Sequence, residues 1–196
     1  MKSDEQLALA AADGDHDALT RLLRQYQQRV YNICLRMLSN RDDAAEAAQD
    51  VMLNVVKGIA RFRSDSKFNT WITRIAMNSS VSLLRKRKLR KTASLDQQSP
   101  NQSATFASQL VDSREHSPDA NVQKKEMIAI LNMALSMISD EYRGILILRD
   151  MQGMDYQQIS EATDIPVGTV KSRLFRARLA LRQQMLKLSP EEKADK

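Results

Sequence analysis

Residues 155–178 read DYQQISEATDIPVGTVKSRLFRAR. Asp155 is a favourable N-cap residue, and Gln158 follows three positions later, as in a capping box at the start of a helix. Pro166 and Gly168 then favour a turn, and a segment rich in arginine comes after them. We expect a helix, a tight turn and a second helix, which is the layout of a helix-turn-helix.

The second helix of this pair has an apolar stripe and a cationic face. At about 100° per residue, the stripe carries Val170, Leu174, Ala177, Leu181 and Leu188, and the roughly opposite side carries Thr169, Ser172, Arg173 and Arg176. In a helix-turn-helix the second helix enters the major groove, where Arg bonds guanine and Ser or Thr bonds phosphate. The segment therefore predicts DNA binding, with a plain helical hairpin and a solvated arginine face as the alternative.

The composition of the 196-residue chain agrees with this prediction. A net charge of +6 favours a polyanionic partner. The chain has five glycines and four prolines, and no window alternates in the manner of a strand, so we expect an all-α fold. The length allows one or two domains.

We find no sequence pattern for catalysis, metal binding or membrane insertion. The single cysteine, Cys34, lies on an apolar helical stripe, which favours a small buried side chain and excludes an internal disulfide. His16 and His116 are not near any cluster with metal-ligand spacing, so no metal or cofactor is expected. No run of apolar residues approaches a membrane span, and the N-terminus lacks a signal-peptide core, so we expect a soluble cytoplasmic protein.

A change of composition divides the chain into two domains. Residues 93–120 are rich in serine, and their apolar residues have little periodicity, which predicts a flexible linker. The linker is a spacer or, alternatively, a segment that docks on a partner. We therefore expect an N-terminal domain over residues 1–92, a C-terminal four-helix domain over 121–188 and a frayed tail over 189–196.

The N-terminal domain carries charge of both signs. Its third predicted helix begins at Asp42 or Asp43 and buries an apolar face made of Ala44, Ala48, Val51, Met52, Val55 and Ile59. The opposite face is acidic; from composition alone, an ordinary solvated face is the favoured interpretation. The fourth predicted helix ends in residues 85–91, RKRKLRK, where repulsion between adjacent like charges favours an anionic partner.

Two separate parts of the chain resemble one family. Residues 165–178 resemble the DNA-reading helix of extracytoplasmic-function (ECF, group IV) sigma factors of the sigma-70 family, and residues 139–149, SDEYRGILILR, resemble the helix before it. Residues 43–53, DAAEAAQDVML, are similar to the family segment that binds the polymerase clamp. Residues 62–78, FRSDSKFNTWITRIAMN, are similar to its promoter-melting segment. The closest likeness is to the envelope-stress RpoE/AlgU type.

The resemblance implies a dissociable sigma factor with three binding surfaces. Its acidic face would bind the clamp helices of the largest polymerase subunit through Asp42, Asp43, Glu46, Gln49, Asp50 and Asn54. Its melting segment would contact the −10 element through Arg63, Ser64, Asp65, Lys67, Phe68, Asn69, Trp71, Arg74, Asn78, Arg85 and Arg87. Its recognition helix would contact the −35 element through Thr169, Lys171, Ser172, Arg173, Phe175 and Arg176. For Trp71, core packing and a role at the melted edge are both open.

The resemblance also implies a set of partners and a biological role. They are core RNA polymerase (including its flap), promoter DNA and an anti-sigma factor, in a stress response. No small-molecule substrate and no catalytic residue are expected, because the polymerase performs the chemistry. Two other classes of protein are open at this point: a stand-alone helix-turn-helix regulator that binds duplex DNA, and a helical decoy that binds a sigma regulator without DNA.

Overall fold

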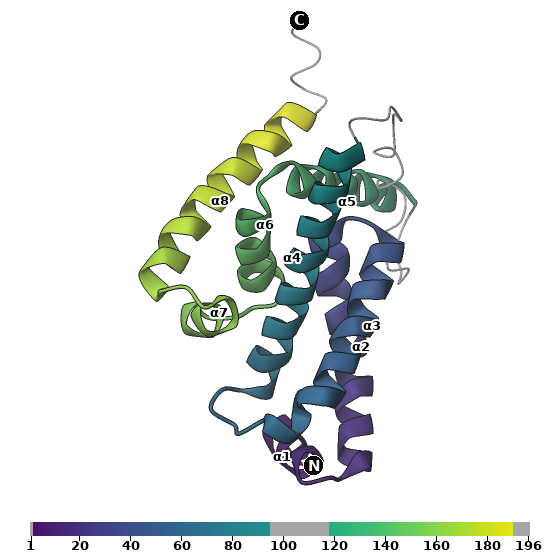
Figure 1. Ribbon diagram of the computed structural model, residues 1–196. Helices are drawn as coiled ribbons and strands as arrows, with labels where there is room; N and C mark the ends of the chain where they lie inside the picture. The colour runs from purple at the N-terminus through teal and green to yellow at the C-terminus, as the bar shows by residue number, and fades with distance from the viewer. Residues whose placement is uncertain (1, 95–117, 190–196) are drawn as a thin grey trace, which may run out of the picture.

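The computed structural model describes residues 2–94 and 118–189, which form helices and connecting turns with no β-strand among them (Figure 1). The N-terminal half contains α1 (Asp4–Ala12), α2 (His16–Leu38), α3 (Arg41–Gly58), the 3-10 turn η1 (Ile59–Arg61) and α4 (Phe68–Ser94). The C-terminal half contains α5 (Pro118–Met137), α6 (Asp140–Leu146), the π-helical turn η2 (Ile147–Met151), α7 (Tyr156–Thr163) and α8 (Val167–Leu188). The all-α prediction is confirmed. Most of the predicted linker lies outside the described residues.

The C-cap of α2 and the N-cap of α3 are adjacent residues, so the two helices form a helical hairpin. Ser39 ends α2 in the left-handed conformation with φ 54°. The next residue, Asn40, is the N-cap of α3, and its side-chain oxygen accepts a hydrogen bond of 3.0 Å from the backbone N–H of Asp43. Such a cap satisfies one of the N–H groups that a helix start leaves without a partner.

The core of the N-terminal half lies between α2, α3 and α4. The predicted inner face of α3 is confirmed, because Ala44, Val51, Val55 and Ile59 are buried while Ala48 and Met52 are partly buried. Cys34 is fully buried in α2, and burial raises the pKa of its thiol to about 11. The prediction that Cys34 is a core side chain is confirmed.

Four aromatic rings close the lower end of this core. Phe68, at the start of α4, is fully buried, with its ring centroid 5.1 Å from Tyr26 and 5.7 Å from both Phe62 and Trp71. Aromatic rings at such separations add to the free energy gained from burying their area. The cluster fixes the loop between η1 and α4 on the rest of the domain.

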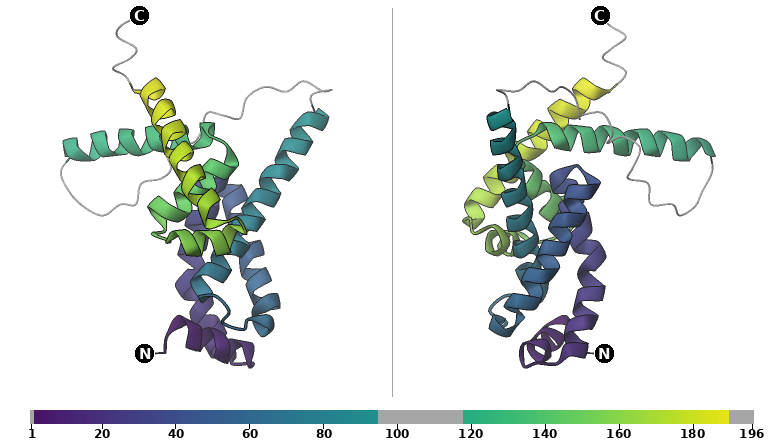
Figure 2. Two further views of the ribbon diagram at one scale, coloured as in Figure 1. Left: turned by 90° about the vertical axis from the view of Figure 1, so that its left-hand side faces the viewer. Right: turned by 45° about the vertical axis from the view of Figure 1, so that its right-hand side comes forward.

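The C-terminal half packs its helices around α8. Leu135 and Ile138 of α5 and the adjoining turn, Ile145 and Leu146 of α6, and Leu174 of α8 belong to one buried cluster. The predicted stripe of α8 is confirmed at its start, since Val170, Leu174 and Ala177 are buried. In Figure 2, α5 extends crosswise to the long helices α2, α3 and α4.

The two halves pack directly against each other. Figures 1 and 2 show α6 and α7 beside α4, and α4 contacts α7 extensively. Ile147, Leu148 and Ile159 are fully buried in the same apolar cluster as the residues of α2, α3 and α4. Their burial gives the two halves a common apolar interface. No helix within residues 2–94 or 118–189 has the length and apolarity needed to cross a bilayer.

Candidate nucleic-acid interface

Residues 155–178 form the predicted helix-turn-helix. Asp155 is the N-cap of α7, and its carboxylate accepts a 2.8 Å hydrogen bond from the Gln158 backbone N–H. The Gln158 side-chain oxygen accepts one of 2.9 Å from the Asp155 backbone N–H, which completes the predicted capping box. Reciprocal caps of this kind fix where a helix begins.

The turn between α7 and α8 differs from the expected one at one position. Gly168 is the second residue of α8, so it does not form the turn. The left-handed residue is Asp164, with φ 57°, a conformation that Asp tolerates better than most residues. The Ser160 hydroxyl donates to the Ile165 carbonyl at 2.6 Å, and Pro166 occupies the N-cap of α8.

The outer face of α8 presents polar, cationic and aromatic side chains. Ser172 and Arg176 are exposed, and Phe175 is 73% exposed. An exposed aromatic on such a helix suits contact with a thymine methyl group, while Arg suits guanine. Thr169 is partly buried, and its carbonyl accepts a 3.1 Å hydrogen bond from the Ser172 hydroxyl.

Two cations near the start of α8 contact other parts of the protein. The Lys171 ammonium lies 5.7 Å from the centroid of the Tyr156 ring, a cation–π contact within the motif. Arg173 is partly buried and pairs with the Glu141 carboxylate of α6 at 3.3 Å. Of the predicted −35 residues, Ser172, Phe175 and Arg176 are thus the ones that the structure presents to solvent on the outer face of α8.

The acidic surface of α3 is presented to solvent as predicted. Asp42, Glu46, Gln49, Asp50 and Asn54 are exposed. The sixth predicted residue, Asp43, is partly buried and forms an ion pair with Arg87 of α4. This ion pair links the predicted clamp-binding surface of α3 to the predicted −10 surface of α4.

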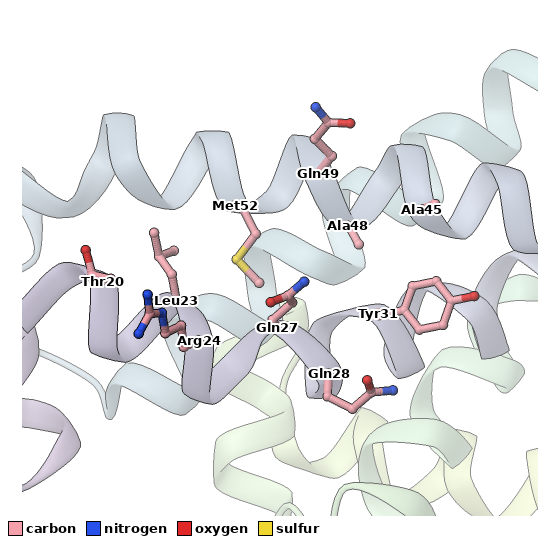
Figure 3. Close-up of a pocket in the computed structure, with 10 residues that line it drawn as sticks. All are labelled: Thr20, Leu23, Arg24, Gln27, Gln28, Tyr31, Ala45, Ala48, Gln49 and Met52. Atoms are coloured by element: carbon pink, nitrogen blue, oxygen red, sulfur yellow. The ribbon is translucent and has the colours of Figure 1, made fainter. Parts of the chain in front are cut away.

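A groove that the sequence does not reveal runs between α2 and α3 beside the acidic surface. It has a volume of about 460 Å³ and is lined by Thr20, Leu23, Arg24, Gln27, Gln28, Tyr31, Ala45, Ala48, Gln49 and Met52 (Figure 3). Gln49 connects this groove to the acidic face. A partly apolar groove next to an exposed charged face is a common composition for a protein interface.

The loop before α4 presents the first part of the predicted −10 set. Arg63, Ser64, Asp65 and Lys67 are exposed, and Ser64 is left-handed with φ 60°. Asn69 is partly buried, and its side-chain oxygen accepts no hydrogen bond from the residues that the structure describes. Exposed polar groups on a loop held by a rigid aromatic cluster are suited to bind a single extruded base.

The predicted −10 contact of Phe68 is wrong for this structure, and Trp71 combines core packing with partial exposure. Phe68 has no exposed surface, so its side chain supports the loop and does not contact DNA in this structure. Trp71 is partly buried; its ring lies 5.5 Å from Phe62 and packs against Gly58, where a Cβ would lie 3.4 Å from the indole. Trp71 therefore packs on the core and keeps a partly exposed edge.

Three of the remaining predicted −10 residues on α4, Arg74, Asn78 and Arg85, face the C-terminal half. Arg74 donates to the Glu161 carbonyl of α7. Asn78 and Arg85 line a cleft between the two halves that also includes Arg173. The cleft also contains two carboxylates, Asp140 and Glu141, for which the sequence predicts no role. The only available signal was two adjacent acids after the N-cap Ser139.

Three comparisons with known proteins agree with this geometry. The family descriptions "Sigma-70 region 2" and "Sigma-70, region 4" match residues 22–90 and 128–181. The chain is 33% identical to ECF RNA polymerase sigma factor SigW of Bacillus subtilis over 88% of this chain and 91% of that protein. It is 28% identical to the ECF RNA polymerase sigma-E factor of Escherichia coli over 91% of this chain and 92% of that protein.

A solved structure is similar along most of the chain. The sigma factor RpoE in complex with the anti-sigma factor NepR, from Bartonella quintana, is 25% identical with a TM-score of 0.66, covering 87% of this chain and 97% of that one. Both segments of the family are thus present in order, on a shared fold. The chain belongs to the extracytoplasmic-function RNA polymerase sigma factors, the dissociable subunits that direct core RNA polymerase to promoters.

Proposed function

We propose that the three exposed surfaces divide the work of a sigma factor. The acidic surface of α3 binds the polymerase clamp, the loop before α4 captures a base of the −10 element, and α8 reads the −35 element. The chain supplies recognition and strand capture, and the polymerase supplies the phosphodiester chemistry. In this proposal the protein is not an enzyme and acts in the cytoplasm.

The geometry of the helix-turn-helix carries this proposal. The capped α7 and the left-handed turn at Asp164 hold α8 with Val170, Leu174 and Ala177 inward. The same orientation turns Ser172 and Arg176 outward, at the end of the helix that enters the major groove in such motifs. A helical decoy that binds no DNA has no use for this arrangement.

Run-off transcription with purified core polymerase tests the proposal. We expect promoter-dependent transcripts when the chain is added to core, and only weak duplex binding by the chain alone. Tight, sequence-specific duplex binding by the free chain together with no stimulation of core polymerase would instead favour a stand-alone regulator.

The clamp assignment predicts the behaviour of a charge reversal on α3. Glu46→Lys should weaken holoenzyme formation about tenfold or more, because it places like charge against a complementary surface. Co-purification with core polymerase, measured over a titration, checks this. Asp17→Lys, the same change of charge at an exposed residue of α2, is the control. Unchanged co-purification of the Glu46 variant would refute the clamp assignment.

The recognition assignment predicts a loss of specificity at one promoter element. Arg176→Ala should cost about 1–3 kcal/mol in binding to the −35 element and relax specificity there. The test is selection of −35 sequences from a random library by holoenzymes with wild-type and variant chains. Arg182→Ala, at an exposed residue further along α8, should leave the selected sequence unchanged. If the Arg176→Ala holoenzyme selects the same −35 sequences as the wild type, Arg176 does not contact the bases of this element.

An anti-sigma factor is the proposed regulatory partner. The similar RpoE structure contains such a partner, NepR. In this chain, an inhibitor that covers α4 or α8 would hide the residues assigned to DNA.

A further inference from the structure

The N-terminal helix α1 packs against the elements on both sides of the −10 loop, which comprises residues 63–67. It contacts η1, which precedes the loop, and α4, which follows it (Figure 1). Leu7, Ala8 and Ala11 of α1 are buried in the core cluster that also contains Ile59 of η1. None of the three proposed binding surfaces includes α1, yet the helix supports the loop that we assign to base capture.

The side chain of Asp4 connects α1 to the aromatic cluster of the core. Its Oδ2 accepts a 2.5 Å hydrogen bond from the hydroxyl of Tyr26, and its Oδ1 accepts one of 2.8 Å from the side-chain amide of Gln25. A hydroxyl that donates to a carboxylate at this distance forms a short, charge-assisted hydrogen bond. Burial and the bond to Asp4 both raise the pKa of Tyr26, so the hydroxyl stays protonated and remains the donor.

The Tyr26 ring extends this connection to the start of α4. Tyr26 is buried, and its ring meets the fully buried Phe68 edge-on, with the centroids 5.1 Å apart and the ring planes at 81°. Because an edge-on pair is directional, a hydrogen bond that holds the hydroxyl also fixes where the Tyr26 ring meets Phe68. Phe68 is the first residue of α4 and directly follows Lys67, the last residue of the −10 loop. Two side chains thus connect Asp4 to the loop.

The helix starts of α1 and α2 fix Asp4 relative to Tyr26. Ser3 and Gln6 form a capping box with hydrogen bonds of 2.9 Å and 3.2 Å, so that α1 begins at Asp4. The carboxylate of Asp15, the N-cap of α2, accepts a 2.9 Å hydrogen bond from the backbone of the first turn of that helix. Both partners of the bond between Asp4 and Tyr26 are therefore carried by helices with defined starts.

We propose that Asp4 is a positioning residue for base capture at the −10 element. It acts through Tyr26 and Phe68, and it holds residues 63–67 in the conformation that accepts an extruded base. A loop that is already held in place loses less conformational entropy when the base enters, and this raises the affinity for that base. The inference rests on the −10 loop of the proposed function and extends that function to a helix outside the three binding surfaces.

Variants of the full chain test each step of this connection. Asp4→Ala removes the acceptor, whereas Asp4→Asn keeps a carbonyl oxygen for the Tyr26 hydroxyl. Tyr26→Phe removes the hydroxyl and keeps the ring that packs on Phe68. The double variant Asp4→Ala/Tyr26→Phe shows whether the two residues act through one another. Glu5→Ala removes the other acidic side chain of the same first turn and is the matched control.

Selectivity for the captured base is measured on holoenzymes. Each holoenzyme is titrated with fluorescent single-stranded oligonucleotides that carry the −10 sequence selected by the wild type, one of them intact and each of the others lacking the base at one position. The position at which the wild type loses most affinity marks the captured base, and the ratio of the two affinities there is the capture ratio. A variant that is only partly folded binds both oligonucleotides less in the same proportion, so its capture ratio is unchanged.

We expect a wild-type capture ratio of about tenfold or more, as for the contacts of one bound base. Asp4→Ala and Tyr26→Phe should each lower this ratio about three- to tenfold, and the double variant should lower it no further than the larger single effect. Asp4→Asn and Glu5→Ala should stay within about twofold of the wild type. The affinity for core polymerase should not change, since neither Asp4 nor Tyr26 lies on the acidic surface of α3.

An unchanged capture ratio in both Asp4→Ala and Tyr26→Phe would overturn the role of Asp4 and leave base capture by the loop standing. Losses that multiply in the double variant, or an equal loss in Glu5→Ala, would overturn it as well. Urea denaturation verifies the folding of each variant; if Asp4→Ala is unfolded, Tyr26→Phe decides the test. A wild-type holoenzyme that loses no affinity at any missing base would contradict the proposed base capture itself, and this inference with it.

Discussion

Replacing Phe68 by alanine should lower the free energy of unfolding by about 3–5 kcal/mol. The ring is fully buried between Tyr26, Phe62 and Trp71, so its removal leaves a cavity where three other rings meet. Urea denaturation of the full chain measures the loss. Trp71 is the only tryptophan, and its contact with Phe68 makes its fluorescence a local reporter of the transition.

Lys67→Ala, at the exposed neighbouring residue, is the control and should change stability by less than about 0.5 kcal/mol. If Phe68→Ala unfolds at the same urea concentration as the wild type, the placement of this ring in the core is contradicted. That result would favour contact between Phe68 and the −10 element instead.

Replacing Arg143 by methionine should cost about 3–5 kcal/mol, because several buried carbonyls lose a charged donor at once. The buried guanidinium donates to the carbonyls of Met37 at 2.6 Å, Leu135 at 2.8 Å, Ser136 at 3.0 Å and Ile138 at 3.2 Å. These carbonyls lie at and just beyond the end of α5, where a cation is also favoured by the helix dipole. Burial lowers the pKa of Arg143, with Asp140 opposing this shift.

The position of the tryptophan allows unfolding of the N-terminal half to be measured separately. Trp71 lies in the N-terminal half and Arg143 in the C-terminal half. A lower urea midpoint in Trp71 fluorescence for Arg143→Met would therefore show that the two halves unfold together. Arg21→Met, at an exposed residue of α2, controls for loss of one charge. If far-ultraviolet circular dichroism changes and the Trp71 transition does not, the halves are energetically independent.

Much of the fold could be predicted because its signals are local. The capping box of Asp155 and Gln158, the end of α2 at Ser39 and the inner face of α3 each depend on residues within a few turns of each other. The inner face of α8 followed from the spacing of Val170, Leu174 and Ala177, which are all buried.

The sequence could not reveal features that depend on contacts between distant residues. Nothing near Phe68 distinguishes a loop residue that binds a base from one that holds the loop in place. The close approach of Gly144 to Met77 and Met37 gives no signal, because these methionines come from other helices. Asp140 and Glu141 resemble the ordinary acidic first turn of a helix until the cations of α4 and α8 are placed beside them.

The ion pair between Asp43 and Arg87 has a thermodynamic consequence for holoenzyme assembly. Asp43 belongs to the surface assigned to the clamp, and Arg87 to the surface assigned to the promoter. If the proposed contacts form, a clamp residue that pairs with Asp43 releases Arg87 for a phosphate. Linkage then requires the reverse effect to be equal: a promoter that captures Arg87 must strengthen clamp binding by the same factor. Through this one shared carboxylate, binding of the polymerase clamp would raise the affinity for the promoter, and binding of the promoter would raise the affinity for the clamp.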